Sequence, residues 1–389
     1  MMEALGRSGL AVEALSGIKH GANGNADPAA WLDARGLAYE MVGGGAWAVG
    51  AGGIQADRPE HYRLMFQGVP ITLHRDLPGD VGRSEFLRLF DEVLDRFRPD
   101  VLVNYGGDRL AHEIRSRARA RGIAVVFTLH NFNYHSTQPF TTADAVIVPS
   151  RFAAEHYRRT LGLHCEVLSN IIDLGRVQIG AHDSQYVTFV TPSYEKGVYA
   201  FARIADELGR RRPDIPLLVV EGRGTERTLV DCGIDLRVHG NVSLMANTPD
   251  PRQFWSVTKL CLMPSLWWEN QPLAAIEAMV NGIPVIGSDR GGIPETLGDA
   301  GVILPLPERL TSTTRELPTP EEIAPWVEAV IRLWDDPVVY RDHRERAHRE
   351  AERWKTERLE ASYAKFFFER VPGHSPHTLV SGPLHANDP

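Results

Sequence analysis

Short apolar segments alternate with amphipathic helical segments in two successive runs, and this alternation constrains the fold more than any other feature. Several apolar segments, such as IAVVFTL at residues 123–129, are continuously apolar, which is typical of parallel strands covered on both faces. The strands expected in the first run are residues 10–16, 69–75, 100–105, 123–129 and 143–150. The second run extends from Tyr186 to Leu304. The pattern predicts an α/β fold of two doubly wound parallel-sheet domains, with ligands at the carboxyl ends of the strands.

Helices between the strands are marked by capping residues and by apolar spacing. Ser84 is expected to cap a helix whose apolar residues recur every three or four positions up to Phe97. Ser150 is expected to cap the helix at residues 151–162. The second run is expected to have strands at residues 186–191, 215–222, 236–240, 260–263 and 283–287, and helices at residues 198–212, 252–258 and 273–281.

The domain boundaries follow from the point where the alternation pauses. Residues 175–185 are polar with little periodicity, so we expect a linker there between an N-terminal Rossmann-like domain (1–174) and a C-terminal one (186–350). A terminal helix at residues 351–371 is expected to cross back to the first domain. Residues 372–389 are expected to be disordered. The chain begins within the alternation, so the first domain is expected to lack its opening strand.

Composition excludes several classes of protein. The 389 residues carry 42 Lys and Arg against 50 Asp and Glu, and this net charge of −8 argues against binding nucleic acid. Three widely spaced cysteines indicate neither a zinc site nor a disulfide framework. No apolar run reaches the roughly 18 residues of a membrane span, and no signal peptide is evident, so we expect a cytoplasmic protein. Two glycine-rich stretches, residues 17–25 and 43–53, lack GxGxxG and are expected to be surface turns.

Two glutamates in the stretch from Cys261 to Gly301 carry the chemistry we expect. Glu269 lies in the turn after a strand, and Glu277 lies about one turn inside the following helix. Carboxylates there can accept hydrogen bonds from sugar hydroxyls, while free N–H groups at the helix start can hold an anion. From spacing alone, the favoured alternative is a solvated loop glutamate and a helix glutamate paired with a Lys or Arg.

The longer segment PSLWWENQPLAAIEAMVNGIPVIGSDRGGIPETL closely resembles the donor-binding signature of the GT-B glycosyltransferases of family 4. Glu269 and Glu277 match the E-x7-E pair of that family. The later motif residues are matched by Gly282, Pro284, Gly291, Gly292, Pro294 and Glu295. The resemblance implies a GT-B fold, in which two Rossmann-like domains face each other across a cleft. Members begin with a strand and a Gly-Gly loop, so their absence here indicates either a start codon placed too far downstream or a shortened first domain.

The resemblance also assigns residues to the donor diphosphate. VTPSYEKG at residues 190–197 is similar to the segment whose Arg and Lys hold that diphosphate; Lys196 matches the lysine, and Thr191 stands where the arginine is usual. A lysine alone supplies only a point charge. Arg223, in a loop that resembles another family motif, is the candidate for the missing charge.

Further positions are implied to contact the donor sugar. Glu269 and the adjoining turn are expected to hold its hydroxyls, with Glu277 on the ribose. The turn and helix start that contribute to donor binding are Asn270, Gln271, Pro272 and Leu273. His130, at the end of a strand in the first domain, resembles the histidine that faces the sugar, although a strand-end histidine by itself is more often structural. Trp267 and Trp268 are candidates for core packing and, for one of them, sugar stacking.

The expected activity is therefore transfer of a sugar from a nucleotide diphosphate-sugar to an acceptor, which is a glycan, a lipid-linked molecule or a small molecule. The resemblance implies retention of configuration, no metal and no cofactor, with His130, Lys196 and Glu269 as the catalytic residues. Arginine-rich helices at residues 114–121 and 340–353 are interpreted as solvated faces; the alternative is peripheral contact with an anionic membrane. Two alternative functions remain, a nucleotide-sugar epimerase of the same fold and a catalytically silent nucleotide-sugar-binding protein.

Overall fold

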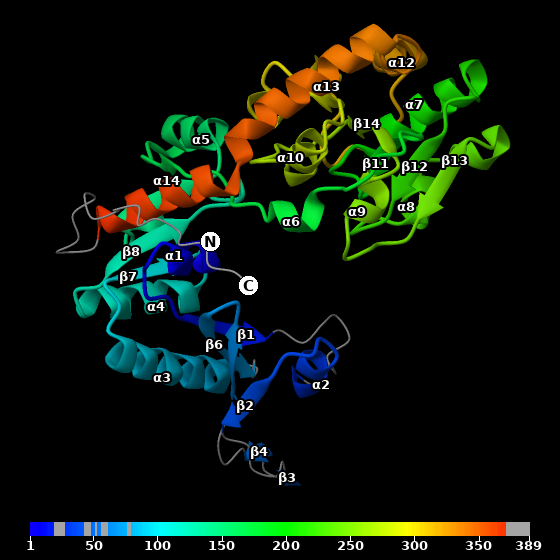
Figure 1. Ribbon diagram of the computed structural model, residues 1–389. Coiled ribbons are helices and arrows are strands. Elements are labelled where there is room, and N and C mark those ends of the chain that lie inside the picture. The colour runs from blue at the N-terminus through cyan, green and yellow to red at the C-terminus, as the bar shows by residue number, and fades with distance from the viewer. Residues whose placement is uncertain (19–27, 43–47, 51–52, 56–60, 76–78, 371–389) are drawn as a thin grey trace, which may run out of the picture. The chain divides into compact units, whose positions relative to one another are not determined.

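The computed structural model describes residues 1–18, 28–42, 48–50, 53–55, 61–75 and 79–370 (Figure 1). Contacts divide the chain into two compact units. The first contains residues 1–128, 136–147 and those from 360 onward, and the second contains residues 129–135 and 148–359. The predicted disordered tail and most of the two glycine-rich stretches lie outside the described residues. The domain boundaries proposed at residues 174 and 186 stay a prediction.

The second unit is a doubly wound α/β structure. Its strands are β10 (Glu166–Val167), β11 (Tyr186–Val190), β12 (Leu217–Val220), β13 (Val242–Met245), β14 (Thr258–Met263), β15 (Val285–Ser288) and β16 (Val302–Leu304). Its helices are α5 (Arg151–Leu161), α6 (Leu174–Val177), α7 (Val198–Arg211), α8 (Glu226–Val230), η2 (Leu236–His239), α9 (Arg252–Trp255), α10 (Leu273–Val280), α11 (Ile293–Leu297), α12 (Pro320–Asp335), α13 (Pro337–Ala351) and η3 (Glu352–Trp354). The sheet runs in the order β13-β12-β11-β14-β15-β16 with parallel pairings, as the sequence predicts.

Alternate residues of each strand enter alternate cores, because successive side chains point to opposite faces of a sheet. Leu217 and Val219 of β12 belong to the core beneath α7 and α12, and these two helices lie side by side (Figure 1). Leu218 and Val220 belong to the core beneath α9, α10 and α13. Burial of such a side chain contributes roughly 1.5–3 kcal/mol. Apolar residues on both faces explain why these strands read as continuous apolar runs.

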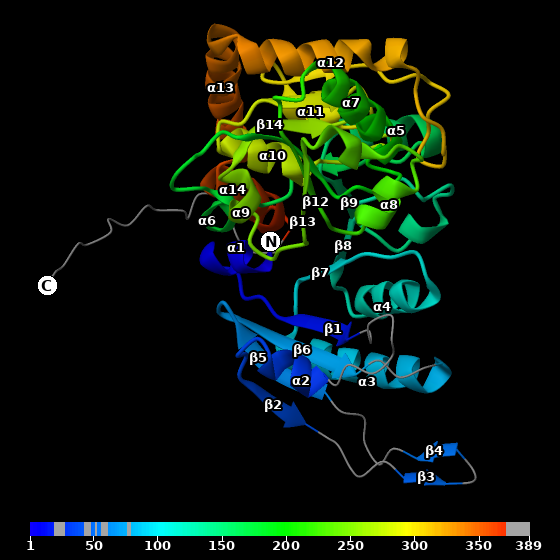
Figure 2. The ribbon, with the colours of Figure 1, turned by 90° about the vertical axis from the view of Figure 1, so that its right-hand side faces the viewer.

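The first unit combines parallel and antiparallel pairings. Its helices are α1 (Met2–Arg7), α2 (Pro28–Asp33), α3 (Gly79–Phe97), α4 (Arg109–Ala120) and η1 (Gln138–Phe140), and α14 (Thr356–Phe368) extends into it. Its strands are β1 (Ala14–Ile18), β2 (Tyr39–Val42), β3 (Ala48–Gly50), β4 (Gly53–Gln55), β5 (His61–Phe66), β6 (Val69–Arg75), β7 (Val101–Asn104), β8 (Ala124–Thr128) and β9 (Ala145–Val148). The strands β7, β8 and β9 are parallel, whereas the sheet β1-β6-β5-β2 is mixed (Figure 2).

One element was missed, and two expectations about single elements are wrong. The antiparallel β5–β6 hairpin was not predicted; Gln67 and Gly68 join its strands with φ of 49° and 81°, the left-handed conformation of a type I′ turn. Helix α3 begins at Gly79, so Ser84 lies inside the helix and does not cap it. LRVHG forms a 3-10 turn instead of a strand, because Asp235 caps its start and Gly240 ends it, and the edge strand is β13.

The basic helix α4 is only partly a solvated face. Arg115 is fully buried and donates hydrogen bonds to Asn104 Oδ1 (2.7 Å) and Gly106 O (2.9 Å). Arg117 and Arg121 form ion pairs with Asp91. These three arginines are thus paired within the protein, and peripheral contact with an anionic membrane stays an untested alternative. In the described part of the chain, no helix is long and apolar enough to cross a membrane.

Candidate functional site

The candidate site lies where neighbouring parallel strands of the second unit end. The loops after β12, β11, β14 and β15 meet at the carboxyl edge of the sheet, and the strand order reverses between β11 and β14. Two glycines bring these loops into backbone contact. A Cβ on Gly197 would lie 1.8 Å from Pro264 O, and one on Gly292 would lie 2.3 Å from Asn270 O. The sequence thus builds a close-packed loop cluster at the position where open α/β sheets bind ligands.

Lys196 and Glu269 meet at this reversal point. The Lys196 ammonium, after β11, forms an ion pair with the Glu269 carboxylate, after β14, and Ser265 Oγ donates to the same carboxylate (3.0 Å). The loops are fixed by backbone bonds, since the N–H groups of Leu266 and Trp267 both donate to Glu195 O (2.9 Å). The cation and the carboxylate that the sequence assigned to different parts of the donor are therefore neighbours.

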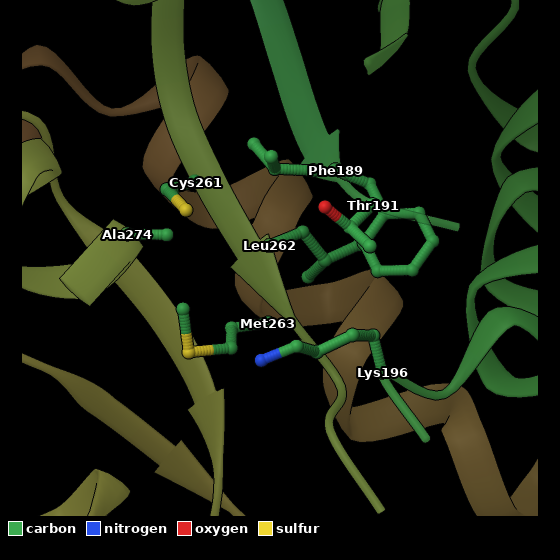
Figure 3. A pocket seen from close by; sticks show the side chains of 8 residues that line it. Phe189, Thr191, Lys196, Cys261, Leu262, Met263 and Ala274 are labelled. Carbon is green, nitrogen blue, oxygen red and sulfur yellow. The ribbon is translucent and has the colours of Figure 1, made fainter. Parts of the chain in front are cut away.

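A cavity of about 90 Å³ opens beside Lys196. Figure 3 shows the Lys196 side chain extending toward Met263, with Thr191 and Ala274 on the other walls. Cys261 also lines the cavity, and burial raises the pKa of its thiol to about 12. The thiol is consequently neutral and a poor nucleophile near neutral pH.

Thr191 adopts an unusual backbone conformation with φ of 61°. A β-branched residue in the left-handed region is strained, and such strain clusters at functional sites. The turn packs tightly against the loop after β12: a Cβ on Gly222 would lie 2.5 Å from Thr191 Oγ1, and one on Gly224 would lie 2.1 Å from Pro192 O. Between these glycines, Arg223 is exposed, with no ion pair among the described residues.

The turn before α10 offers backbone donors, while its polar side chains are already occupied. Asn270 Oδ1 accepts from Ser150 Oγ (3.0 Å), and Gln271 Oε1 accepts from Asn170 N (2.8 Å). Pro272 caps α10 but has no N–H group. It therefore cannot donate to a ligand, although residues 270–273 were all expected to contribute to donor binding. The N–H of Leu273 lies in the first helical turn, where no intrahelical acceptor exists. Backbone rather than side-chain groups of this turn are available to a ligand.

His130 lies just beyond β8 and is exposed at its surface. Its neighbours are anchored: Asn270 Nδ2 donates to Leu129 O (3.5 Å), and Tyr157 Oη donates to Asn131 O (2.6 Å). Desolvation by the surrounding protein lowers the pKa of His130 below its usual value. The structure therefore places His130 next to the backbone that contacts the Glu269–Asn270 turn.

Glu277 is held from a neighbouring helix rather than by a Lys or Arg. Trp255 Nε1 of α9 donates to Glu277 Oε2 (3.0 Å). Burial raises the pKa of the Glu277 carboxyl, and the bond from Trp255 offsets this only in part. Glu269 instead contacts Lys196 and Ser265, and neither glutamate is among the residues that line the cavity beside Lys196. The two glutamates thus occupy separate environments within the second unit.

The sequence analysis assigned no role to three polar residues of this region. Ser265 and Trp255 donate to the two glutamates, and neither position carries a local signal. Glu295 accepts from the N–H groups of Arg151 (2.9 Å) and Phe152 (2.8 Å), so this motif residue caps α5 together with Ser150. Among the described residues, no cluster of three or more His, Cys, Asp or Glu side chains could hold a metal ion.

Comparisons with known proteins show the family of the chain. The sequence profile of the family described as "Glycosyl transferases group 1" matches residues 184–336, and that of "Glycosyltransferase Family 4" matches residues 31–176. The chain belongs to the GT-B glycosyltransferases of family 4. This glycosyltransferase therefore has the two-domain α/β fold that the sequence predicts.

Solved structures of the same fold are similar over most of this glycosyltransferase. Sucrose-phosphate synthase of Thermosynechococcus elongatus is 16% identical, with a TM-score of 0.59 over 77% of this chain and 83% of that one. Anabaena HepE, solved with UDP and glucose, is 17% identical, with a TM-score of 0.58 over 77% of this chain and 86% of that one.

A relative in sequence is an exopolysaccharide phosphotransferase of Streptomyces coelicolor. It is 24% identical over 139 residues, which are 35% of this chain and 13% of that protein.

Proposed function

We propose that this glycosyltransferase moves a sugar from a nucleotide diphosphate-sugar to an acceptor, with retention of configuration and without a metal ion. The observation that carries the proposal is the Lys196–Glu269 pair at the sheet's reversal point, beside the unpaired N–H groups at the start of α10. A cation with backbone donors suits a diphosphate, and a carboxylate suits sugar hydroxyls. The binding of UDP and glucose by HepE, which has a similar fold, supports this reading.

In the proposed reaction, Lys196 and Arg223 stabilise the charge that develops on the departing diphosphate. Glu277 accepts hydrogen bonds from the donor ribose, Glu269 accepts them from the sugar, and His130 contacts the sugar. Because the Cys261 thiol is neutral, it is a poor candidate for a covalent intermediate. We therefore favour departure of the diphosphate and attack by the acceptor on one face of the sugar, within a single ion-pair-like transition state.

The first experiment is a thermal-shift titration of UDP-, GDP-, ADP- and TDP-sugars, with wild type and Glu277→Ala compared. One nucleotide series should raise the melting temperature of wild type, and Glu277→Ala should lose most of that response. The matched control is Glu328→Ala, which removes an exposed carboxylate of α12 that pairs with Arg211. Failure of every nucleotide to stabilise wild type, or an equal response of Glu277→Ala, would contradict the proposal.

A turnover assay with the stabilising nucleotide sugar separates transfer from the two alternative activities. Transfer requires release of the nucleoside diphosphate when an acceptor extract is added. Interconversion of the sugar without release would identify an epimerase. Tight binding with neither outcome would identify a silent binding protein.

A further inference from the structure

Trp268 is an exposed aromatic side chain held by other rings. It is 46% exposed, although it lies in the loop cluster at the edge of the sheet. The rings of Phe132, Phe152 and His156 contact it at centroid distances of 6.0, 6.1 and 5.3 Å, each nearly perpendicular to the indole. Phe132 in turn stacks on the buried ring of Tyr157. We call Trp268, Phe132, Phe152 and His156 the Trp268 platform.

The backbone of Trp268 is fixed as well as its ring. Gly291, with φ of +58°, packs so closely that a Cβ there would lie 2.8 Å from Trp268 C and 2.5 Å from Glu269 N. Edge-to-face contacts with three rings restrict the indole further. A ligand that stacks on this ring would therefore meet a side chain whose conformational entropy is already lost, which favours binding.

The platform and the proposed donor site lie on different sides of one turn. The Glu269 side chain contacts Lys196 and Ser265, whereas the adjacent Trp268 side chain contacts Phe132 and rings of α5. Because Trp268 and Glu269 are adjacent in the chain while their side chains contact different groups, a molecule on the indole would lie near the proposed donor site without occupying it. This is the position that a second substrate, rather than the donor, would occupy.

The chemistry of the platform fits a neutral ring better than an anion. Burial first, and then the neighbouring Arg159 and His135, lower the pKa of His156. Its imidazole is therefore neutral near pH 7 and can exchange hydrogen bonds with hydroxyl groups. The arginines that follow on α5, Arg158 and Arg159, both form ion pairs with Glu155. An apolar face bordered by a neutral imidazole, with the nearest arginines of α5 paired to Glu155, matches a pyranose, which has C–H faces and a rim of hydroxyls.

We propose that the Trp268 platform binds a sugar ring of the acceptor, so that the acceptor of this enzyme is a glycan or glycoside. This inference rests on the proposed function, since it takes the Lys196–Glu269 side of the turn as the donor site. The indole stacks on one face of the sugar, and the imidazole of His156 contacts its hydroxyls.

Saturation-transfer NMR tests the proposal with methyl glycosides of glucose, galactose, mannose and N-acetylglucosamine. At least one glycoside should receive saturation at its ring C–H groups from wild type. Loss of a stacking contact should weaken this binding roughly five- to tenfold in Trp268→Leu, and Trp268→Phe should restore part of it. The matched control is Trp31→Leu, which removes a similarly exposed indole (42%) from the first unit and should match wild type.

Calorimetry with a nucleoside diphosphate separates this proposal from the proposed function. Trp268→Leu should bind the diphosphate as wild type does, because the platform lies on the other side of the turn. The platform proposal is wrong if no glycoside binds wild type, if Trp268→Leu binds glycosides unchanged, or if Trp268→Leu instead loses binding to vesicles of phosphatidylcholine and phosphatidylglycerol. Glycoside binding that depends on Trp268 without any diphosphate binding would uphold the platform and contradict the donor site.

Discussion

At the scale of single residues, the Lys196–Glu269 ion pair means that two groups assigned to the donor neutralise each other without it. A diphosphate has to compete with the carboxylate for the ammonium and is repelled by it. We therefore expect Glu269→Gln to bind a free nucleoside diphosphate about three- to tenfold more tightly than wild type, because the amide keeps an acceptor for Ser265 but carries no charge. Isothermal titration calorimetry measures this difference.

Unlike the free diphosphate, the full nucleotide sugar should not bind Glu269→Gln more tightly than it binds wild type. In Glu269→Gln it should gain little or no affinity over the free diphosphate, since the carboxylate that would accept from the sugar hydroxyls is gone. Lys196→Met should bind both the free diphosphate and the nucleotide sugar more weakly than wild type does. Glu328→Gln, which opens an exposed ion pair with Arg211, should change neither. Weaker diphosphate binding by Glu269→Gln would show that the pair does not compete with the ligand.

The buried carboxyl of Glu277 should make stability depend on pH. Its pKa in the folded protein is raised above the usual 4.5, so between pH 4.5 and the raised pKa the folded state binds more protons than the unfolded state. The free energy of unfolding therefore falls as pH rises through that window. The fall is about 1.4 kcal/mol for each tenfold difference between the proton affinities of the carboxyl in the folded and unfolded states. Urea unfolding at several pH values should show this fall in wild type relative to Glu277→Gln.

The control for this pH dependence is Glu308→Gln, which removes an exposed carboxylate and should follow wild type at every pH. Parallel pH profiles of wild type and Glu277→Gln would contradict a raised pKa at Glu277.

At the scale of elements, the turn between β15 and α11 depends on Gly291. An alanine there would adopt a left-handed φ, at a cost of about 1–2 kcal/mol, and its Cβ would overlap the backbone of Glu269. Gly233 has a similar φ of +77°, but a Cβ there has open space around it. Chemical denaturation should therefore show that Gly291→Ala loses roughly 1–3 kcal/mol more than Gly233→Ala.

Nucleotide binding distinguishes the two glycine variants further. Gly291→Ala should bind the nucleotide sugar more weakly, because the Glu269 backbone must shift, whereas Gly233→Ala should bind it as wild type does. Equal losses of stability and of affinity in the two variants would show that the contact with Glu269 is unimportant.

At the scale of the whole molecule, the sequence predicts best where local and tertiary signals agree. The strands β11, β12 and β14 were predicted because both their faces are buried, and α5 because Ser150 caps it. The β5–β6 hairpin was missed because its Gln-Gly turn lacks the usual Asn-Gly signal.

Partners that arise from tertiary packing cannot be read from spacing. The motif resemblance identifies both Glu269 and Glu277 as site residues. Their partners come from distant parts of the chain: Lys196, in the loop before α7, contacts Glu269, and Trp255 of α9 contacts Glu277. Likewise, the pair Trp267-Trp268 indicates stacking or packing, and only the arrangement of α5 shows which ring is exposed and what surrounds it.

The division into two units predicts how the whole chain should unfold. Two compact units, each with its own core, are expected to give two calorimetric transitions rather than one. The groups that we assign to the nucleotide sugar all lie within residues 129–135 and 148–359, so the ligand should stabilise only the transition of that unit, by about 2.7 kcal/mol at 100 times Kd. Hydrogen exchange should assign this transition: amides of β14 and α10 should gain protection with the nucleotide, while those of β5 and β6 should not. Equal protection of both regions would mean that the two units unfold as one cooperative structure, because a ligand bound to one unit can then stabilise the other only through their coupling.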